Sequence, residues 1–230
     1  MGKTDIKRPA FWRFMMEWIR PIQDRVAAHS FLSSYVPTKR IDPHTVLVIP
    51  GLLASDFSTR PMRSYLDRLG YTTVDWGLGR NLARLEQVEV LSALVQKLST
   101  EEPISIIGWS LGGLYARRLA DLHPDKVRKV ITLASPYKHL EAPNNASWLF
   151  SFFQLLRGKA RQEPPAWVVS IGAPVSVPSV AFYTKQDGIV PWQACCDFED
   201  PTDHQNIEVY TGHNALGVNK YVLEKLVEVL

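Results

Sequence analysis

The sequence is poor in three features that would each define a class of protein: long hydrophobic runs, cysteine, and net charge of one sign. No stretch approaches the roughly 20 apolar residues that a membrane-spanning helix needs. The only two cysteines, Cys195 and Cys196, are adjacent. Neighbouring cysteines rarely pair with each other, so a disulfide framework is not expected and a reducing compartment fits. The net charge is only +3, and no basic run is interleaved with aromatic residues, so we expect no nucleic-acid partner.

The composition that remains is that of an ordinary globular chain. Its 230 residues, 46% hydrophobic and 21% charged, are enough for one domain with a full core. The N-terminus is similar to a signal peptide at first sight, because basic residues precede an apolar stretch. However, Arg13, Glu17 and Arg20 interrupt that stretch, and no small-residue cleavage site follows. We therefore expect a cytoplasmic protein.

The most informative segment is residues 103–120, P-I-S-I-I-G-W-S-L-G-G-L-Y-A-R-R-L-A. An apolar β-branched run ends at Gly108, Ser110 follows, and an amphipathic helical pattern begins directly afterwards. A bare G-x-S-x-G pentapeptide is also compatible with a Gly-rich surface turn, but the flanking strand and helix favour a nucleophile elbow. Gly108 and Gly112 omit side chains where strand and helix would collide. The pattern predicts that Ser110 is the nucleophile of a serine hydrolase.

The rest of the chain alternates between strand and helix patterns. Besides the strand and helix around Ser110, strands are expected at residues 45–49, 71–76, 127–134, 180–183 and 207–210, and helices at 10–29, 61–69, 82–98 and the C-terminus. Strands that are apolar on both faces and alternate with helices indicate a parallel sheet covered on both sides.

Four motifs, G-W-S-L-G-G, P-G-L-L-A-S, T-K-Q-D-G-I-V-P and T-G-H-N, make residues 44–230 resemble the esterase/lipase branch of the α/β-hydrolase superfamily. The run G-W-S-L-G-G-L with L-H-P-D-K-V is also similar to small carboxylesterases that cleave short acyl esters. The superfamily usually opens with an antiparallel hairpin, whereas residues 1–43 suggest an amphipathic helix and a linker packed on the core. The resemblance therefore implies an α/β-hydrolase fold with a reduced, mostly parallel sheet of about six strands, helices on both faces and a small helical cap.

The base and acid of the expected triad follow Ser110 in the chain, since the order in this fold is serine, acid, histidine. Of the six histidines, His213 in T-G-H-N is the best base, because it follows the last predicted strand at the edge where Ser110 is expected. His139 is its only competitor, because the other four lie at the opposite edge or precede Ser110. Asp187 follows the penultimate strand and precedes His213 by 26 residues. An Asp before Gly is common in turns, but its position between elbow and histidine favours the role of triad acid.

The oxyanion that develops in acyl transfer needs two backbone N–H donors. Leu111, directly after the nucleophile, is expected to supply one. The second is expected from V-I-P-G-L-L-A-S, which resembles the H-G-x motif of the family with Pro50 in place of histidine. Leu52 is then the donor, and Gly51 lets the backbone turn inward. We expect no cofactor and no metal.

Two apolar segments leave alternatives open. The insertion at about residues 138–177 contains S-W-L-F-S-F-F-Q-L-L-R-G, which is apolar nearly all round a helix. It is either a lid over an acyl pocket, lined by Trp148, Phe152 and Phe153, or a core helix under a long loop. Trp109 is a further candidate for the pocket, with a packing role as the alternative. The N-terminal helix at residues 10–29 either packs on its own domain or lies weakly on a membrane surface.

Together these patterns predict a serine hydrolase that cleaves carboxylic esters of small-to-medium apolar acyl groups through an acyl-enzyme. Its partner is a small-molecule ester. One alternative is an acyltransferase that uses the same triad, with an alcohol outcompeting water. The other is a binding module that has kept the fold without turnover.

Overall fold

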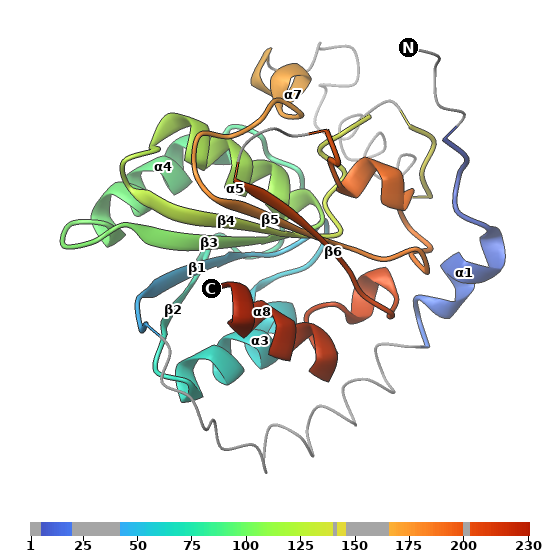
Figure 1. Cartoon of the computed structure of the whole chain (residues 1–230), viewed down its shortest axis with the longest axis horizontal. Helices are drawn as coiled ribbons and strands as arrows, with labels where there is room; N and C mark the ends of the chain where they lie inside the picture. The colour runs from blue at the N-terminus through green and yellow to red at the C-terminus, as the bar shows by residue number, and fades with distance from the viewer. Residues whose placement is uncertain (1–5, 20–41, 140–141, 146–165, 200–202) are drawn as a thin grey trace.

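A six-stranded sheet forms the centre of the computed structural model, which describes residues 6–19, 42–139, 142–145, 166–199 and 203–230 (Figure 1). The sheet has the order β2-β1-β3-β4-β5-β6, and every neighbouring pair is parallel. Its strands are β1 (Thr45–Ile49), β2 (Thr72–Asp75), β3 (Ile104–Trp109), β4 (Val127–Leu133), β5 (Ser179–Tyr183) and β6 (His204–Glu208). This architecture confirms the predicted reduced, parallel α/β sheet.

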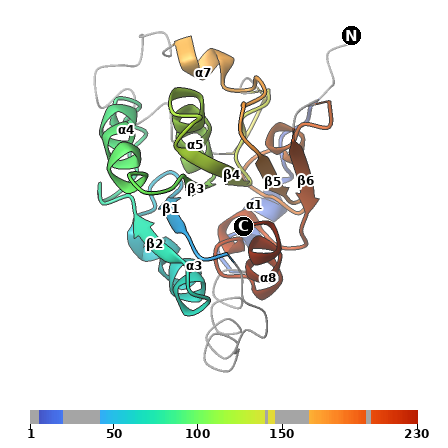
Figure 2. The same cartoon turned by 60° about the vertical axis from the view of Figure 1, so that its left-hand side comes forward.

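Helices cover both faces of the sheet (Figure 2). One layer is formed by α3 (Asp56–Arg68) and α8 (Lys220–Val229), and the other by α4 (Gln87–Leu98) and α5 (Leu111–Leu122). The described residues also include α1 (Phe11–Met16), α7 (Ala166–Ser170) and two short 3₁₀ turns, η1 (Trp192–Cys195) and η2 (His213–Ala215).

Each helical layer buries its own apolar cluster against the sheet. Along β1, Val46 and Val48 face the cluster under α3 and α8, whereas Leu47 and Ile49 face the cluster under α4 and α5. All four side chains are fully buried. Because successive side chains point to opposite faces and both faces are covered, β1 is a continuous apolar run. The predicted strand at 45–49 is therefore correct to the residue.

Three predicted elements begin at the wrong residue, α3 and α4 by five residues (61 − 56 and 87 − 82) and β6 by three (207 − 204). The helix α3 begins five residues before the predicted 61–69 and contains Pro61 in its interior. The helix α4 begins later than the predicted 82–98, because Ala83 has a φ of 57° and so interrupts the helical conformation. The last strand, β6, begins earlier than the predicted 207–210, since its register pairs it with the whole length of β5.

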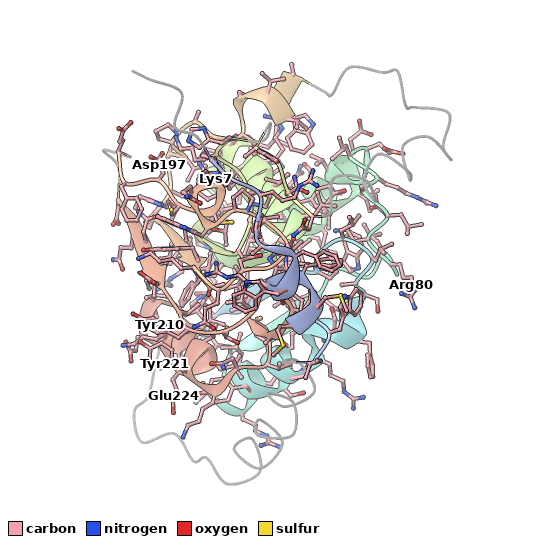
Figure 3. The ribbon with its side chains drawn as sticks, turned by 90° about the vertical axis from the view of Figure 1, so that its right-hand side faces the viewer. Lys7, Arg80, Asp197, Tyr210, Tyr221 and Glu224 are labelled. Carbon is pink, nitrogen blue, oxygen red and sulfur yellow. The ribbon has the colours of Figure 1, made fainter. Side chains whose placement is uncertain are left out.

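The N-terminal helix is shorter over its described part than the predicted 10–29, and none of the residues of α1 is fully buried. Residues 17–19 form a turn after α1, and residues 20–29 lie outside the described residues. Trp12 and Trp18 are 59% and 65% exposed, whereas Glu17 is fully buried. Figure 3 shows α1 on the surface of the molecule. The fully buried residue of this described segment is therefore a polar one, Glu17, while both tryptophans are exposed and Phe14 and Met16 are half-buried.

The expected cap at about residues 138–177 falls largely outside the described residues, because its aromatic centre is not described. The described parts of the cap are residues 138–139, 142–145 and 166–177, which include α7. Trp148, Phe152 and Phe153 lie in the part that is not described. Their assignment to an acyl pocket, and the choice between a lid and a core helix, stay predictions. Within the described ranges, no helix is both long enough and apolar enough to cross a membrane.

Candidate active site

Ser110 lies at the apex of the turn between β3 and α5, as the sequence predicts. Its backbone has φ 52° and ψ −120°, a conformation that L-residues rarely adopt. The turn is fixed by neighbouring strands, since the N–H of Ser110 donates to the carbonyl of Leu133 at 2.8 Å. The side chain of Ser110 is partly exposed at the carboxyl edge of the sheet. Strand, strained serine and helix together form the geometry of a nucleophile elbow.

Glycines make this turn possible by close approach of backbone segments. A Cβ atom on Gly108 would overlap the backbone of Gly112 and Gly113, and one on Gly112 would overlap the carbonyl of Ile49. The predicted crowding at Gly108 and Gly112 is therefore present. Gly113, which the sequence analysis did not single out, is equally crowded, because a Cβ there would overlap the side chain of Ser135.

The loop after β1 passes beside Ser110, at the point where the strand order changes direction. The chain leaves β1 towards β2 on one side and returns to β3 on the other. In parallel α/β sheets, ligands bind in the crevice at such a switch point. A Cβ on Gly51 would lie 3.1 Å from the Cβ of Ser110, so the loop that carries Leu52 is adjacent to the nucleophile. Leu111 is the first residue of α5, where helical N–H groups have no intrahelical acceptor.

Asn81 holds this loop in place, and the sequence analysis did not identify it. Its side-chain amide donates to the carbonyl of Pro50 at 2.8 Å, and its backbone N–H donates to the carbonyl of Ala54, also at 2.8 Å. The N–H of Leu53 donates in turn to the Asn81 carbonyl at 2.7 Å. Asn81 is fully buried. These bonds fix the backbone on both sides of Leu52.

Asp187 and His213 form a buried pair at the same edge of the sheet. The Nδ1 of His213 lies 2.7 Å from the Oδ2 of Asp187. The other carboxylate oxygen, Oδ1, accepts the N–H groups of Ile189 at 2.7 Å and Val190 at 2.8 Å. The indole N–H of Trp109 donates to the His213 carbonyl at 3.1 Å. The structure therefore brings the histidine loop against the residue that precedes Ser110.

Electrostatics favour the charged form of the His213 imidazole. Burial alone would lower the pKa of His213, but the charge and hydrogen bond of Asp187, together with the charge of Glu17, outweigh it. The pKa of His213 is therefore raised above its ordinary value of 6.5. An imidazole of raised pKa is a stronger base towards a serine hydroxyl.

The other described histidines lie elsewhere. His204 is the first residue of β6 and bonds Ser179 at the amino end of β5, which is the opposite edge, as expected. His123 ends α5 and bonds Ser92. His139, the competitor from the sequence, is exposed after β4, and it is His213 that meets the Asp187 carboxylate.

The predicted pocket residue Trp109 is only 7% exposed and packs in the cluster under α3 and α8. Its described contacts are with the histidine loop, and a contact with substrate stays a prediction. A cleft of about 350 Å³ opens beside the pair, between residues 7–13 and the loop after β5, and Asp187 lines it. No cluster of three or more potential metal ligands occurs among the residues that the structure describes.

Comparison with known proteins shows the family. The chain matches the model of the alpha/beta hydrolase fold over residues 44–173, and it belongs to that family. The naproxen esterase of Bacillus subtilis is 15% identical with a TM-score of 0.58, and the match covers 99% of each chain. A thioesterase domain from the curacin biosynthetic pathway is 16% identical with a TM-score of 0.56, covering 83% of this chain and 91% of that domain. At such identities the likeness shows the fold alone.

One similarity to curated proteins is local. Homoserine O-acetyltransferase of Thermus thermophilus is 34% identical over 85 residues, which are 37% of this chain and 19% of that enzyme. The matched segment thus spans about a fifth of the relative's length.

Proposed function

We propose that this chain is a serine hydrolase that cleaves carboxylic esters of small-to-medium apolar acyl groups. The observation that carries the proposal is the buried Asp187–His213 pair, 2.7 Å apart, held by Trp109 beside the strained Ser110. Serine, aspartate and histidine, at positions 110, 187 and 213, occur in the chain order that this family uses. The chemistry that such a set performs is acyl transfer through a covalent intermediate.

In the proposed first step, His213 removes the proton of Ser110 while the serine oxygen attacks the ester carbonyl. Asp187 holds the proton on Nδ1 of His213, so that Nε2 is available as the base. The carbonyl oxygen becomes an oxyanion and accepts hydrogen bonds from the N–H groups of Leu52 and Leu111. Removal of one such donor typically costs about 3 kcal/mol of transition-state stabilisation.

In the second half of the reaction, the intermediate collapses and the alcohol leaves with the proton from His213. An acyl group then remains on Ser110. Water enters, loses its proton to His213 and attacks the acyl-enzyme, which releases the acid and restores the serine. His213 accepts or donates the proton in every proton transfer of this cycle.

Transfer of the acyl group to an alcohol is the second candidate function. The local similarity to homoserine O-acetyltransferase supports it, and the same three residues would perform it. Product analysis of hydrolysis in the presence of a primary alcohol separates the two. A transferase gives mainly the new ester at low alcohol concentration, whereas a hydrolase gives mainly the acid.

We also propose weak contact of α1 with an anionic membrane surface. Phe11 and Trp12 of α1, and Trp18 just after it, are 59–72% exposed. The exposed cations Lys7 and Arg8 precede α1 in the chain. Exposed aromatic residues flanked by cations are typical of helices that lie at the interface of anionic lipids.

Hydrolysis of p-nitrophenyl esters of graded acyl length tests the main proposal. We expect turnover of short and medium esters by the wild-type chain and a loss of at least about 1000-fold in Ser110→Ala. Ser170→Ala, at an exposed position in α7, is the matched control and should keep full activity. Equal turnover by Ser110→Ala and the control would refute the assignment of the nucleophile. No turnover by the wild-type chain would favour the binding module.

A further inference from the structure

A buried carboxylate lies at the end of an otherwise exposed helix. Glu17 follows α1 and is fully buried, and it is the only buried residue of the described segment 6–19. Its neighbour Trp18 is 65% exposed. This is the reverse of ordinary amphipathic packing, in which the aromatic residue is buried and the carboxylate is solvated. Burial of a carboxylate is costly unless hydrogen bonds compensate it, so the partners of Glu17 indicate why it is buried.

Those partners are backbone N–H groups of the two loops that carry the proposed acid and base. The Oε1 atom of Glu17 accepts the N–H of Gly188 at 2.9 Å and the N–H of His213 at 2.8 Å. The Oε2 atom accepts the N–H of Asn214, also at 2.8 Å. Gly188 directly follows Asp187 in the chain. One carboxylate thus joins the loop of the acid to the loop of the base. Its three hydrogen bonds are charge-assisted and are therefore stronger than bonds between neutral groups.

Both loops have glycine where the N-terminal segment approaches. A Cβ on Gly212 would lie 2.8 Å from the Oε2 of Glu17, and one on Gly188 would overlap the backbone of Arg13. Glu17 also caps the start of η2. The N–H groups at the start of a helical turn have no acceptor within that turn, and the Glu17 carboxylate accepts the N–H of His213, the first residue of η2. The loops are shaped to receive this carboxylate.

Two further side chains seat the segment on the acid loop. Asn145 donates to the carbonyls of Pro9 at 3.2 Å and Gly188 at 2.7 Å, so it joins the two. The guanidinium of Arg13 donates to the carbonyl of Lys185 at 2.5 Å. The N-terminal segment is therefore bound to the loop of Asp187 on both sides of that residue.

We propose that Glu17 is a positioning residue of the active site, which fixes the Asp187 loop and the His213 loop relative to each other. The inference rests on the proposed function, because it assigns Glu17 a part in aligning the acid and the base. This role makes the N-terminal segment a component of the site, although the segment precedes residues 44–173, which match the family.

The charge of Glu17 gives this role a distinct signature. The charged groups that act on the imidazole are two carboxylates, Asp187 from the loop after β5 and Glu17, which directly follows α1. Trp109 of β3, which bonds the His213 carbonyl, is neutral. Burial raises the pKa of the Cys195 thiol well above its ordinary value, with Asp187 adding to the effect, so η1 contributes no charge at neutral pH. Removal of the Glu17 charge should therefore lower the pKa of His213.

Two variants of the full chain test the proposal, with Glu101→Gln as the control at an exposed site before β3. Glu17→Gln keeps the length of the side chain and removes its charge. Glu17→Asp keeps the charge and shortens the reach by one methylene. The readouts are kcat and KM for a p-nitrophenyl ester, the pH midpoint of kcat/KM, and the pKa of the His213 imidazole by NMR titration. The NMR readout needs no turnover, so it remains informative if the proposed function is wrong.

For Glu17→Gln we expect the imidazole pKa and the pH midpoint to fall together by about half a unit or more. In Glu17→Asp the imidazole pKa and the pH midpoint should stay at their wild-type values, because the charge is kept. The kcat should fall about 10- to 100-fold with little change in KM, because the shorter side chain no longer fixes the two loops relative to each other. If Glu17→Gln does not fold, the kcat of Glu17→Asp alone tests the proposal. Wild-type kcat in Glu17→Asp, or an unshifted imidazole pKa in folded Glu17→Gln, overturns the proposal. A wild-type chain without esterase activity, together with a lowered imidazole pKa in Glu17→Gln, would instead refute the proposed function and leave the role of Glu17 standing.

Discussion

Replacing Asp187 with asparagine should separate the catalytic task of this side chain from its structural task. Its Oδ1 accepts the N–H groups of Ile189 and Val190, while its Oδ2 accepts the Nδ1–H of His213. An asparagine has a single acceptor oxygen, and placing it at the Oδ1 position keeps both backbone bonds. Its NH₂ group then faces Nδ1 of His213 as a donor. It therefore selects the tautomer with the proton on Nε2, which cannot act as a base.

The two tasks have different magnitudes. The wrong tautomer lowers kcat by about 10⁴-fold in serine proteases, which corresponds to about 5.4 kcal/mol of activation free energy. The cost to stability is small, about 1–2 kcal/mol, because a charged hydrogen bond becomes a neutral contact. Asp187→Ala, in contrast, leaves the N–H groups of Ile189 and Val190 without their acceptor. At about 1–3 kcal/mol for each, it should destabilise the fold by about 2–6 kcal/mol.

The assay combines turnover of p-nitrophenyl acetate with urea unfolding of both variants. We expect Asp187→Asn to lose activity while its unfolding midpoint stays near that of the wild-type chain, and Asp187→Ala to lose both. An Asp187→Asn variant that keeps more than a tenth of kcat would refute the role of triad acid. Equal destabilisation in the two variants would refute the assignment of Oδ1 to the backbone amides.

Three further predictions concern pH, packing and the membrane. The acidic midpoint of kcat/KM should lie above 6.5, because the pKa of His213 is raised and only the neutral imidazole accepts the serine proton; a midpoint below 6.5 in a pH–rate profile would contradict this. Gly108→Ala should lower the free energy of unfolding by more than about 3 kcal/mol, since its Cβ would overlap the backbone of α5; a loss under about 1 kcal/mol in urea would show that the elbow can relax. Trp12→Ala combined with Trp18→Ala should at least halve co-sedimentation with anionic liposomes, whereas Val169→Ala, 74% exposed in α7, should not change it; equal pelleting of all three proteins would remove the membrane proposal.

The fold could be predicted from sequence where burial dictates the pattern. The strand at 45–49 and the strand–serine–helix segment around Ser110 are apolar on both faces or carry glycines where the backbone is crowded, and both occur as expected. The edge strand β6 differs from the predicted 207–210 because its first residues are polar. Its position is set by pairing with β5, from Ser179 with His204 onward, rather than by an apolar pattern.

The part of the site that sequence could not reveal consists of long-range contacts. In the sequence, Glu17 only interrupts an apolar run. No local pattern predicts that its carboxylate accepts backbone N–H groups 171 and 196 residues away. Asn81 was likewise hidden, because its partner Pro50 lies 31 residues earlier. Side chains that position a loop through its backbone leave no residue-type signal in that loop, apart from glycines such as Gly212, where a Cβ would lie 2.8 Å from the Glu17 carboxylate.

Mass spectrometry of the chain after reaction with a fluorophosphonate shows whether Ser110 is an activated nucleophile. Such a reagent reacts with a serine that an adjacent base has activated. We predict one adduct for each chain, on the peptide that contains Ser110, with no adduct in Ser110→Ala and slower labelling in Asp187→Asn. An unmodified wild-type chain, or an adduct that persists in Ser110→Ala, would contradict it.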